Sequence, residues 1–519
     1  MESTELPNDT ESLKSIIQDY QQQVSYLEEK VSFLEKAIFG QKSEKKQNLG
    51  YNEKQLTLPG FGEEVSQEPP KETITVPEHT RKKRGRKPIP ENIPRKDIVH
   101  DLPEEEKVCA CGINLSHIGE EVSEKLDYVP AQLKVQRHVR HKYACKSCEG
   151  VESDQGAVKI APMPPQIIPQ GIVSPGLLAH MVTAKFVDAL PFYRQEKQFK
   201  RLGVEISRST MTSWAMSAAN ACESFRDMFR QEILSGYLIN IDETRVQVLK
   251  EKDKSNSSQS YMWAFLGGDP ERPTVLFDYH PSRSRKALEF LEDYKGYIQT
   301  DGYVSYDALG DSPNITHLGC LTHIRRKFMD VLKISKRARK KGGTAQDIVD
   351  LIGQLYDLEK RLAQQKLEPD RIQEQREEHA LPILNKIKSI LDQRVDSTPP
   401  KSKLGTAINY ALNQWDRIVR YVWDGRLRPD NNLVENAIRP IALGRKNWLF
   451  AGHPNGANAG ALFFSIIETA KKNNLEPYAY LRYLFENLPL TSTEEEIKML
   501  MPQYIDRDLI PSPLASQSN

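Results

Sequence analysis

Four short apolar segments in the middle of the chain restrict the fold more than any other feature. They are rich in β-branched and aromatic residues, which favour strands, and they cover residues 237–241, 260–266, 274–278 and 296–300. Hairpin-length connections join the first three segments and predict an antiparallel meander. A helix over residues 284–291 is expected before the fourth strand. Asp242 and Asp301 are then expected at the ends of the first and fourth strands.

The order β-β-β-α-β with acids at two strand tips is the ribonuclease-H-like arrangement. A third acid, Glu435, falls in the first turn of a helix predicted after the turn at Pro429–Asn431, with Asn432 as its N-cap. Converging carboxylates repel one another unless a divalent cation binds between them. Mg²⁺ prefers oxygen ligands, and two such ions about 4 Å apart can drive phosphodiester chemistry. We therefore expect Asp242, Asp301 and Glu435 to be catalytic residues that bind Mg²⁺ (or Mn²⁺).

Each of these acids also has a plainer interpretation. Asn432-x-x-Glu435 fits a capping box, in which the glutamate only accepts a backbone N–H. Asp242 fits a turn or cap residue, and Asp301-Gly302 fits a hairpin turn. The occurrence of all three acids in this order, on a strand, a strand and a later helix, favours the metal-site interpretation.

The expected fold class is a mixed α/β multidomain protein with a ribonuclease-H-like catalytic core. The core covers residues 233–330 and 423–475 and is interrupted by a charged helical insertion at 331–422. A C-terminal helix and tail follow at 476–519. Residues 170–232 read as helix, Gly turn and helix, which is typical of a helix-turn-helix DNA-binding region but equally of a plain helical hairpin. One helix is expected from Thr210 to about Phe229.

The N-terminal segment, residues 1–43, carries apolar residues at alternating steps of four and three from Leu13 to Ile38. This heptad pattern predicts a coiled coil and hence a homo-oligomer; the alternative is one amphipathic helix packed on its own chain. Residues 44–80 are polar and Pro-containing, which is typical of a flexible linker.

Basic residues gather in two places. Residues 81–100 begin with a run that can follow the minor groove of DNA as a hook, although such a run can also be a solvated charge cluster. The basic side chains of this hook are Arg81, Lys82, Lys83, Arg84, Arg86 and Lys87. The second group is expected to face phosphates near the acids. Its members are His323, Arg325, Arg326, Arg439, Arg445 and Lys446.

Four of the six cysteines form two close pairs, Cys109 with Cys111 and Cys145 with Cys148, within residues 101–156. Two pairs of thiolates suit tetrahedral, structural Zn²⁺. Free buried thiols are the alternative, because the single residue between Cys109 and Cys111 is a short spacer. Cys320 is expected in the core rather than on a metal.

The chain has 519 residues and a formal net charge of +1, and 38% of its residues are hydrophobic. No apolar run reaches the ~18 residues of a membrane span. We expect a cytoplasmic, nucleoid-associated protein.

Together these motifs resemble the insertion sequence 66 family of bacterial DDE transposases over nearly the whole chain. Besides the four cysteines, the matching stretches are Phe39–Glu44, Gly85–Pro88, Leu190–Gln195, Asp242–Thr244, Asp301–Tyr303, Cys320–His323, Asp430–Glu435 and Gly444–Trp448. The resemblance implies DNA cleavage and strand transfer at the terminal inverted repeats of a mobile element. It also implies that Asp242, Asp301 and Glu435 are the catalytic triad, and that small accessory proteins can take part.

Two other functions compete with this expectation. A non-catalytic DNA-binding regulator, or a decayed transposase, would use the hook, the cysteines and the coiled coil but not the acids. A nuclease would hydrolyse DNA without joining it.

Overall fold

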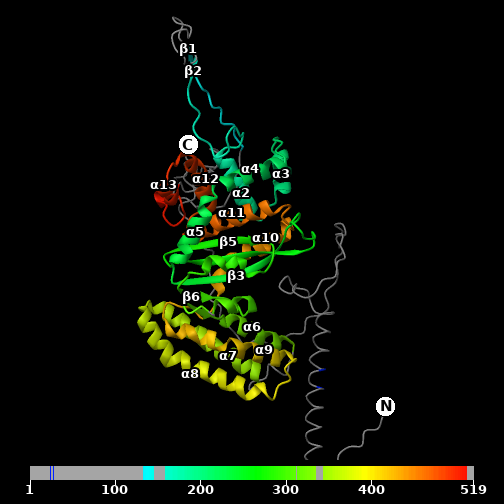
Figure 1. Cartoon of the computed structure of the whole chain (residues 1–519), viewed down its shortest axis with the longest axis vertical. Helices are drawn as coiled ribbons and strands as arrows, with labels where there is room; N and C mark the ends of the chain where they lie inside the picture. The colour runs from blue at the N-terminus through cyan, green and yellow to red at the C-terminus, as the bar shows by residue number, and fades with distance from the viewer. Residues whose placement is uncertain are drawn as a thin grey trace, which may run out of the picture. The chain divides into compact units, whose positions relative to one another are not determined.

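A computed structural model of the chain describes residues 24, 27, 133–144, 158–310, 312–334 and 343–510 (Figure 1). Within the predicted coiled coil, Val24 and Leu27 are helical and exposed. The rest of that segment, the linker, the basic hook, the four paired cysteines and residues 511–519 lie outside the described residues. Those described from residue 133 onward belong to one compact unit.

A five-stranded mixed sheet forms the centre of this unit (Figure 1). Its strands are β3 (Leu238–Gln247), β4 (Gln259–Asp269), β5 (Arg272–His280), β6 (Gly296–Gln299) and β7 (Ile315–Leu318). The sheet order is β5-β4-β3-β6-β7. Strands β3, β4 and β5 pair antiparallel in succession, as the sequence predicted, while β6 pairs parallel with β3 and β7 parallel with β6.

The structure differs from the expectations about this sheet in three places. Asp242 does not end its strand, because the hairpin ladder with β4 continues to Gln247, which pairs with Gln259. The expected helix before β6 is a 3-10 helix, η3 (Arg285–Leu291). The fifth strand, β7, was not predicted.

Helices from both sides of the insertion pack on the sheet in one hydrophobic core. They are α2 (Pro175–Phe186), α3 (Phe192–Arg201), α4 (Arg208–Ala221), α5 (Ser224–Ser235), α10 (Asn432–Trp448), α11 (Pro454–Lys472) and α12 (Pro477–Asn487). Shorter elements complete this part of the chain: η4 (Val304–Leu309), η7 (Leu488–Leu490), α13 (Glu494–Met499) and η8 (Arg507–Leu509). The single helix expected over 210–229 is two helices, because the chain leaves the helical conformation at Cys222. The break lets α4 contact α11 while α5 contacts β4 and β5.

Helix α11 covers the outer edge of β5, where unpaired backbone groups would otherwise be exposed to a second strand. The side chain of Thr469 accepts from Val275 N at 3.0 Å, and that of Ser465 accepts from Phe277 N at 2.7 Å. Asn473 donates to Pro273 O at 2.9 Å. Four helical residues rise about 6 Å and two strand residues about 6.6 Å, so polar side chains four apart can match alternate strand residues.

The insertion is helical, as expected, and has its own hydrophobic core. That core contains α6 (Leu321–Ile334), α7 (Thr344–Gln365), α8 (Pro369–Val395), α9 (Lys403–Val419) and η6 (Arg420–Trp423). Leu318 of β7 extends into it, which attaches the insertion to the β6–β7 side of the sheet. Of the helices that the structure describes, none combines the length and apolarity needed to cross a membrane.

Two further strands, β1 (Lys142–Ala144) and β2 (Val158–Ile160), form an antiparallel pair. Described residues 133–141, which precede β1, form no strand. Val135 and Val139 of that stretch are exposed, so no apolar surface holds it in a sheet.

We expect Gly236→Ala to destabilise the fold by about 1–3 kcal/mol, the usual cost of an overpacked core position. A Cβ on Gly236 would lie 2.6 Å from both N and O of Gly268, and backbone atoms cannot move aside as a side chain can. Gly353 within α7 is the matched control, since nothing lies within 4 Å of its added Cβ. Gly353→Ala should instead stabilise by about 0.4–1 kcal/mol. Urea denaturation midpoints measure both, and equal shifts would contradict this packing argument.

Candidate functional site

The structure brings the three predicted acids together beside strand β3. Asn240 lies opposite Gln299 in the parallel pair of β3 and β6. Asp242 and Asp301 each follow two residues later, so both project from the same face of adjacent chains. Asn431 donates its Nδ2 hydrogen to Ile241 O at 2.8 Å, which fixes the first turn of α10, and hence Glu435, beside β3.

The electrostatics of Asp242 show how closely these acids lie. Burial raises the pKa of Asp242 well above its usual range, and the negative charges of Glu243, Asp301 and Glu435 raise it further. The backbone N–H of Glu243, 2.9 Å from Asp242 Oδ1, opposes the rise only in part. A bound cation would therefore stabilise the ionised form of Asp242.

Glu243, which sequence reasoning did not single out, has two hydrogen-bond partners of its own. Its carboxylate accepts from the Arg283 guanidinium and from the Tyr306 hydroxyl, and its side chain is only 3% exposed. The Arg283 guanidinium also lies 3.1 Å from the ring centroid of Tyr303, two residues after Asp301. The only sequence signal was its position next to Asp242, because Arg283 comes from a loop with no recognisable pattern.

Glu435 does not cap its own helix, so the capping-box interpretation is wrong. The N-cap is Asn431 rather than Asn432, and no side chain caps it. Glu435 Oε2 accepts from Arg326 Nη2 at 3.2 Å, and Oε1 lies 3.6 Å from His323 Nδ1. Arg326 Nη1 lies 3.3 Å from His323 Nε2. Arginine can only donate, so a neutral His323 carries its proton on Nδ1, toward Glu435.

The donor sets of this region suit two classes of cation. The carboxylates of Asp242, Asp301 and Glu435 are hard oxygen ligands that fit Mg²⁺ or Mn²⁺. Donor atoms of Cys320, His323 and Glu435 also lie within 4.8 Å of one another, a set that suits softer ions. Cys320 is buried, as the sequence predicted, and burial raises the pKa of its thiol to about 12.

The expected phosphate-binding cations differ in their surroundings. Arg445 bonds to Thr244 Oγ1 at 3.3 Å and to Arg245 O, so it ties the end of α10 to β3. Arg326 contacts Glu435, as described above. Arg325, Arg439 and Lys446 are exposed.

The helix-turn-helix pattern of residues 170–232 is present in α3 and α4. Gly203, at φ +85°, turns the chain between them, and the Ser207 hydroxyl accepts from Thr210 N at 3.1 Å to begin α4. The inner faces of both helices pack in the sheet core. The outer face of α3 is basic and exposed at Arg194, Lys197, Lys200 and Arg201.

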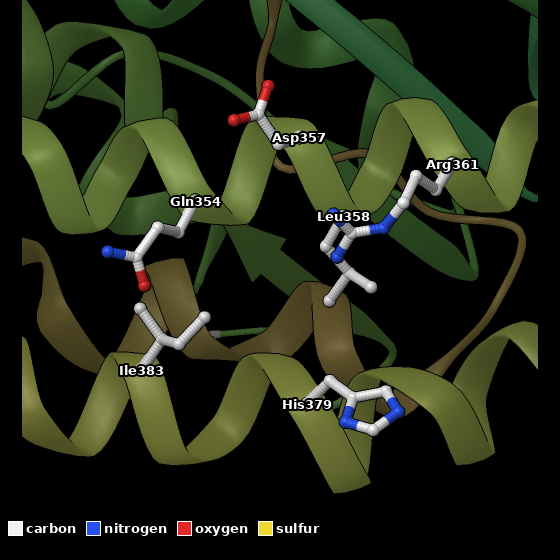
Figure 2. A pocket seen from close by; sticks show the side chains of 6 residues that line it. All are labelled: Gln354, Asp357, Leu358, Arg361, His379 and Ile383. Carbon is white, nitrogen blue, oxygen red and sulfur yellow. The ribbon is translucent and has the colours of Figure 1, made fainter.

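A separate cavity of about 280 Å³ lies between α7 and α8 of the insertion (Figure 2). Gln354, Asp357, Leu358 and Arg361 line it from α7, and His379 and Ile383 from α8. None of the predicted site residues contributes to it, so it is not part of the acidic site.

Comparison with protein families matches four parts of the chain. Residues 170–459 match the profile described as "Transposase IS66 family", and 465–503 match "IS66 C-terminal element". Residues 106–149 match "zinc-finger binding domain of transposase IS66", which supports Zn²⁺ in the cysteine segment. Residues 26–98 match "Transposase C of IS166 homeodomain", which overlaps the predicted coiled coil and basic hook.

Three proteins of Sinorhizobium fredii (strain NBRC 101917 / NGR234) are similar over most of their length. The uncharacterised protein y4jD is 31% identical across 96% of this chain and 96% of its own. The uncharacterised proteins y4hP and y4qI are 28% and 31% identical, across 88% and 82% of this chain and 84% and 80% of their own. These similarities and the profile that matches residues 170–459 identify the chain as a member of the IS66 family of transposases.

Proposed function

We propose that this protein is a DDE-type DNA transposase that cleaves and joins DNA at the terminal inverted repeats of an insertion sequence. The observation that carries the proposal is the meeting of Asp242, Asp301 and Glu435, which stand far apart in the sequence, at one negatively charged site. We assign the three acids as the ligands of two Mg²⁺ ions. When bound, Mg²⁺ would activate a water or 3′-hydroxyl nucleophile and stabilise the leaving oxygen of the phosphodiester.

The sheet supports assigning a ribonuclease-H-like core. Three antiparallel strands in succession are followed by two parallel strands on the other side of β3, in the order β5-β4-β3-β6-β7. Asp242 stands on the central strand β3, and Asp301 follows its parallel neighbour β6. Rigid strands hold two of the acids, and α10 supplies the third.

The surrounding side chains have separate roles in this proposal. Arg283 and Tyr306 bind the carboxylate of Glu243. Asp242 is therefore the acid of β3 that faces the cation site. Arg326 orients Glu435 through its hydrogen bond to Oε2, and His323 lies beside Oε1. The exposed cations Arg325, Arg439 and Lys446 bind DNA phosphates beside the site.

The remaining segments recognise and assemble the DNA ends. The outer face of α3 and the basic hook at 81–100 bind the duplex. A structural Zn²⁺ is bound by Cys109, Cys111, Cys145 and Cys148. The coiled coil brings two copies of the protein, and therefore two element ends, together.

A strand-transfer assay tests the proposal against both rival functions. Full-length protein is incubated with a labelled duplex that carries the inverted repeat flanking its gene, a target plasmid, and either Mg²⁺ or EDTA. We expect 3′-hydroxyl ends and end–target joints in Mg²⁺ and neither in EDTA. Nicks without joints would indicate a nuclease. Binding without any cleavage in Mg²⁺ or Mn²⁺ would indicate a DNA-binding protein and would overturn the proposal.

A further inference from the structure

Three buried amide side chains lie directly beneath the three acids. They are Asn240, Gln299 and Asn431, whose exposed fractions are 2%, 0% and 1%. Asn240 and Gln299 each stand two residues before Asp242 and Asp301, and Asn431 stands four residues, about one helical turn, before Glu435. Each acid therefore has an amide one repeat earlier along the chain. We call these three residues the amide cluster.

Hydrogen bonds join the amide cluster into one unit. Asn240 Nδ2 donates to Gln299 Oε1 at 3.0 Å and to Asn431 Oδ1 at 2.8 Å. Asn431 Nδ2 donates to Ile241 O at 2.8 Å, on the residue just before Asp242. Buried side chains thus connect strand β3, strand β6 and the start of helix α10 to one another.

The amide cluster also forms hydrogen bonds with the backbone at both ends of the helical insertion. Gln299 Nε2 donates to Gly319 O at 3.1 Å, just before α6, and to Arg428 O at 2.9 Å, after the insertion has ended. The backbone N–H of Asn431 contacts Cys320 Sγ at 3.3 Å. Since the whole insertion separates β7 from α10 along the chain, covalent connection cannot set the position of Glu435 relative to Asp242.

We propose that the amide cluster is the positioning device of the catalytic site, with Asn431 as its central residue; this rests on the proposed function of the three acids. Apolar contacts of α10 with the core, through residues such as Val434 and Ile438, hold the helix against the sheet. Such contacts tolerate small slides and rotations, whereas hydrogen bonds require a defined distance and angle. The amide cluster therefore fixes the register that brings Glu435 to the two aspartates.

The choice of amides follows from the same surroundings. A carboxylate at any of the three positions would add a negative charge beside three acids that already repel one another. An apolar side chain would leave buried carbonyls such as Ile241 O and Arg428 O without a donor. An amide donates and accepts at once and carries no charge.

The test compares metal binding with stability in the full-length protein. Mn²⁺ affinity is measured by electron paramagnetic resonance, and the site in question is the one that Asp242→Asn removes. We expect Asn431→Ala to weaken this site about 10–100-fold, as loss of a supporting hydrogen bond does at metal centres. Asn473→Ala is the matched control, because Asn473 is 4% exposed and donates two side-chain hydrogen bonds far from the acids.

The control separates positioning from general destabilisation. Asn473→Ala should lower the melting temperature as Asn431→Ala does, yet leave Mn²⁺ affinity within about twofold, because it supports no ligand. Should Asn431→Ala fail to fold, Asn240→Ser removes the same connection within β3 and should give the same loss of affinity. Equal Mn²⁺ affinity in the parent, the Asn431 or Asn240 variant and the control would overturn the positioning role alone. A parent protein with no Asp242-dependent Mn²⁺ site would instead overturn the proposed function, and the positioning role with it.

Discussion

Asp242→Asn is expected to abolish Mg²⁺-dependent DNA cleavage while making the metal-free protein more stable. Loss of a metal ligand should reduce strand cleavage by at least about 10³-fold, which corresponds to about 4 kcal/mol of transition-state stabilisation. The gain in stability has a separate cause. Burial and three neighbouring carboxylates raise the pKa of Asp242 well above its usual range, so its ionised form destabilises the folded state without metal.

The pH dependence of this gain follows from the direction of the pKa shift. A carboxyl with a raised pKa in the folded state favours folding when protonated, and that contribution is lost as pH rises through the folded-state value. The variant should therefore melt higher than the parent near neutral pH, and the two should converge below about pH 4, the ordinary range of an aspartate. For a domain of 150–250 residues, each kcal/mol corresponds to about 2–4 °C in melting temperature.

Added Mg²⁺ provides the control for this prediction. A ligand that binds only the folded state stabilises it, so Mg²⁺ should raise the melting temperature of the parent and not of the variant. DNA binding, measured by gel shift in EDTA, should be retained in both. A variant that cleaves like the parent would exclude Asp242 as a catalytic residue, and a variant that melts lower in the absence of metal would contradict the proposed charge repulsion.

The sequence pattern located the sheet and the acids because both depend on local signals. Short apolar runs rich in β-branched and aromatic residues identified the strands around Asp242, and turn residues marked the helix that carries Glu435. Partners chosen by tertiary packing were not predictable in the same way. Arg326, expected on phosphate, contacts Glu435 across 109 residues of sequence. The bond from Asn431 to Ile241 spans 190 residues.

Secondary-structure boundaries failed where packing overrode propensity. Residues 210–229 have a continuous helical pattern, yet the chain breaks at Cys222 because α4 and α5 must contact different elements. The apparent capping box at Asn432 and Glu435 is not formed, because Glu435 faces His323 and Arg326 from another helix. In both places, contacts distant in sequence outweighed a local preference.

The helical insertion depends on one buried arginine, and Arg376→Ala should destabilise it severely. Arg376, in α8, is 3% exposed and forms two hydrogen bonds with Glu359 of α7, at 2.8 and 2.7 Å. It also donates to Tyr421 O, Asp424 O and Leu427 O at 2.9–3.1 Å. Removing it leaves the Glu359 carboxylate, which is 17% exposed, and three carbonyls without this donor. Breaking a buried ion pair by removing one partner costs about 3–5 kcal/mol.

An exposed ion pair on the same helix separates burial from charge. Arg371 pairs with Glu374 at 2.5 Å, but their side chains are 71% and 58% exposed. Arg371→Ala should therefore leave the urea denaturation midpoint close to that of the parent. Urea denaturation compares the two variants, and hydrogen exchange shows whether α7 and α8 open before the sheet. Similar small losses in both would mean that the Arg376 bonds contribute no more than a surface pair.

The carbonyls that accept hydrogen bonds from Arg376 lie in the segment that leads to the acidic site. Residues 421–427 run directly into Arg428, whose carbonyl is bound by Gln299 beneath the acids. If residues 421–427 become mobile in Arg376→Ala, Asn431 and Glu435, which follow them, should lose their fixed positions. The Asp242-dependent Mn²⁺ site should then bind Mn²⁺ more weakly in this variant. Arg371→Ala should leave it unchanged. An Arg376→Ala protein that melts early yet binds Mn²⁺ like the parent would show that the amide cluster holds α10 in place without support from the insertion.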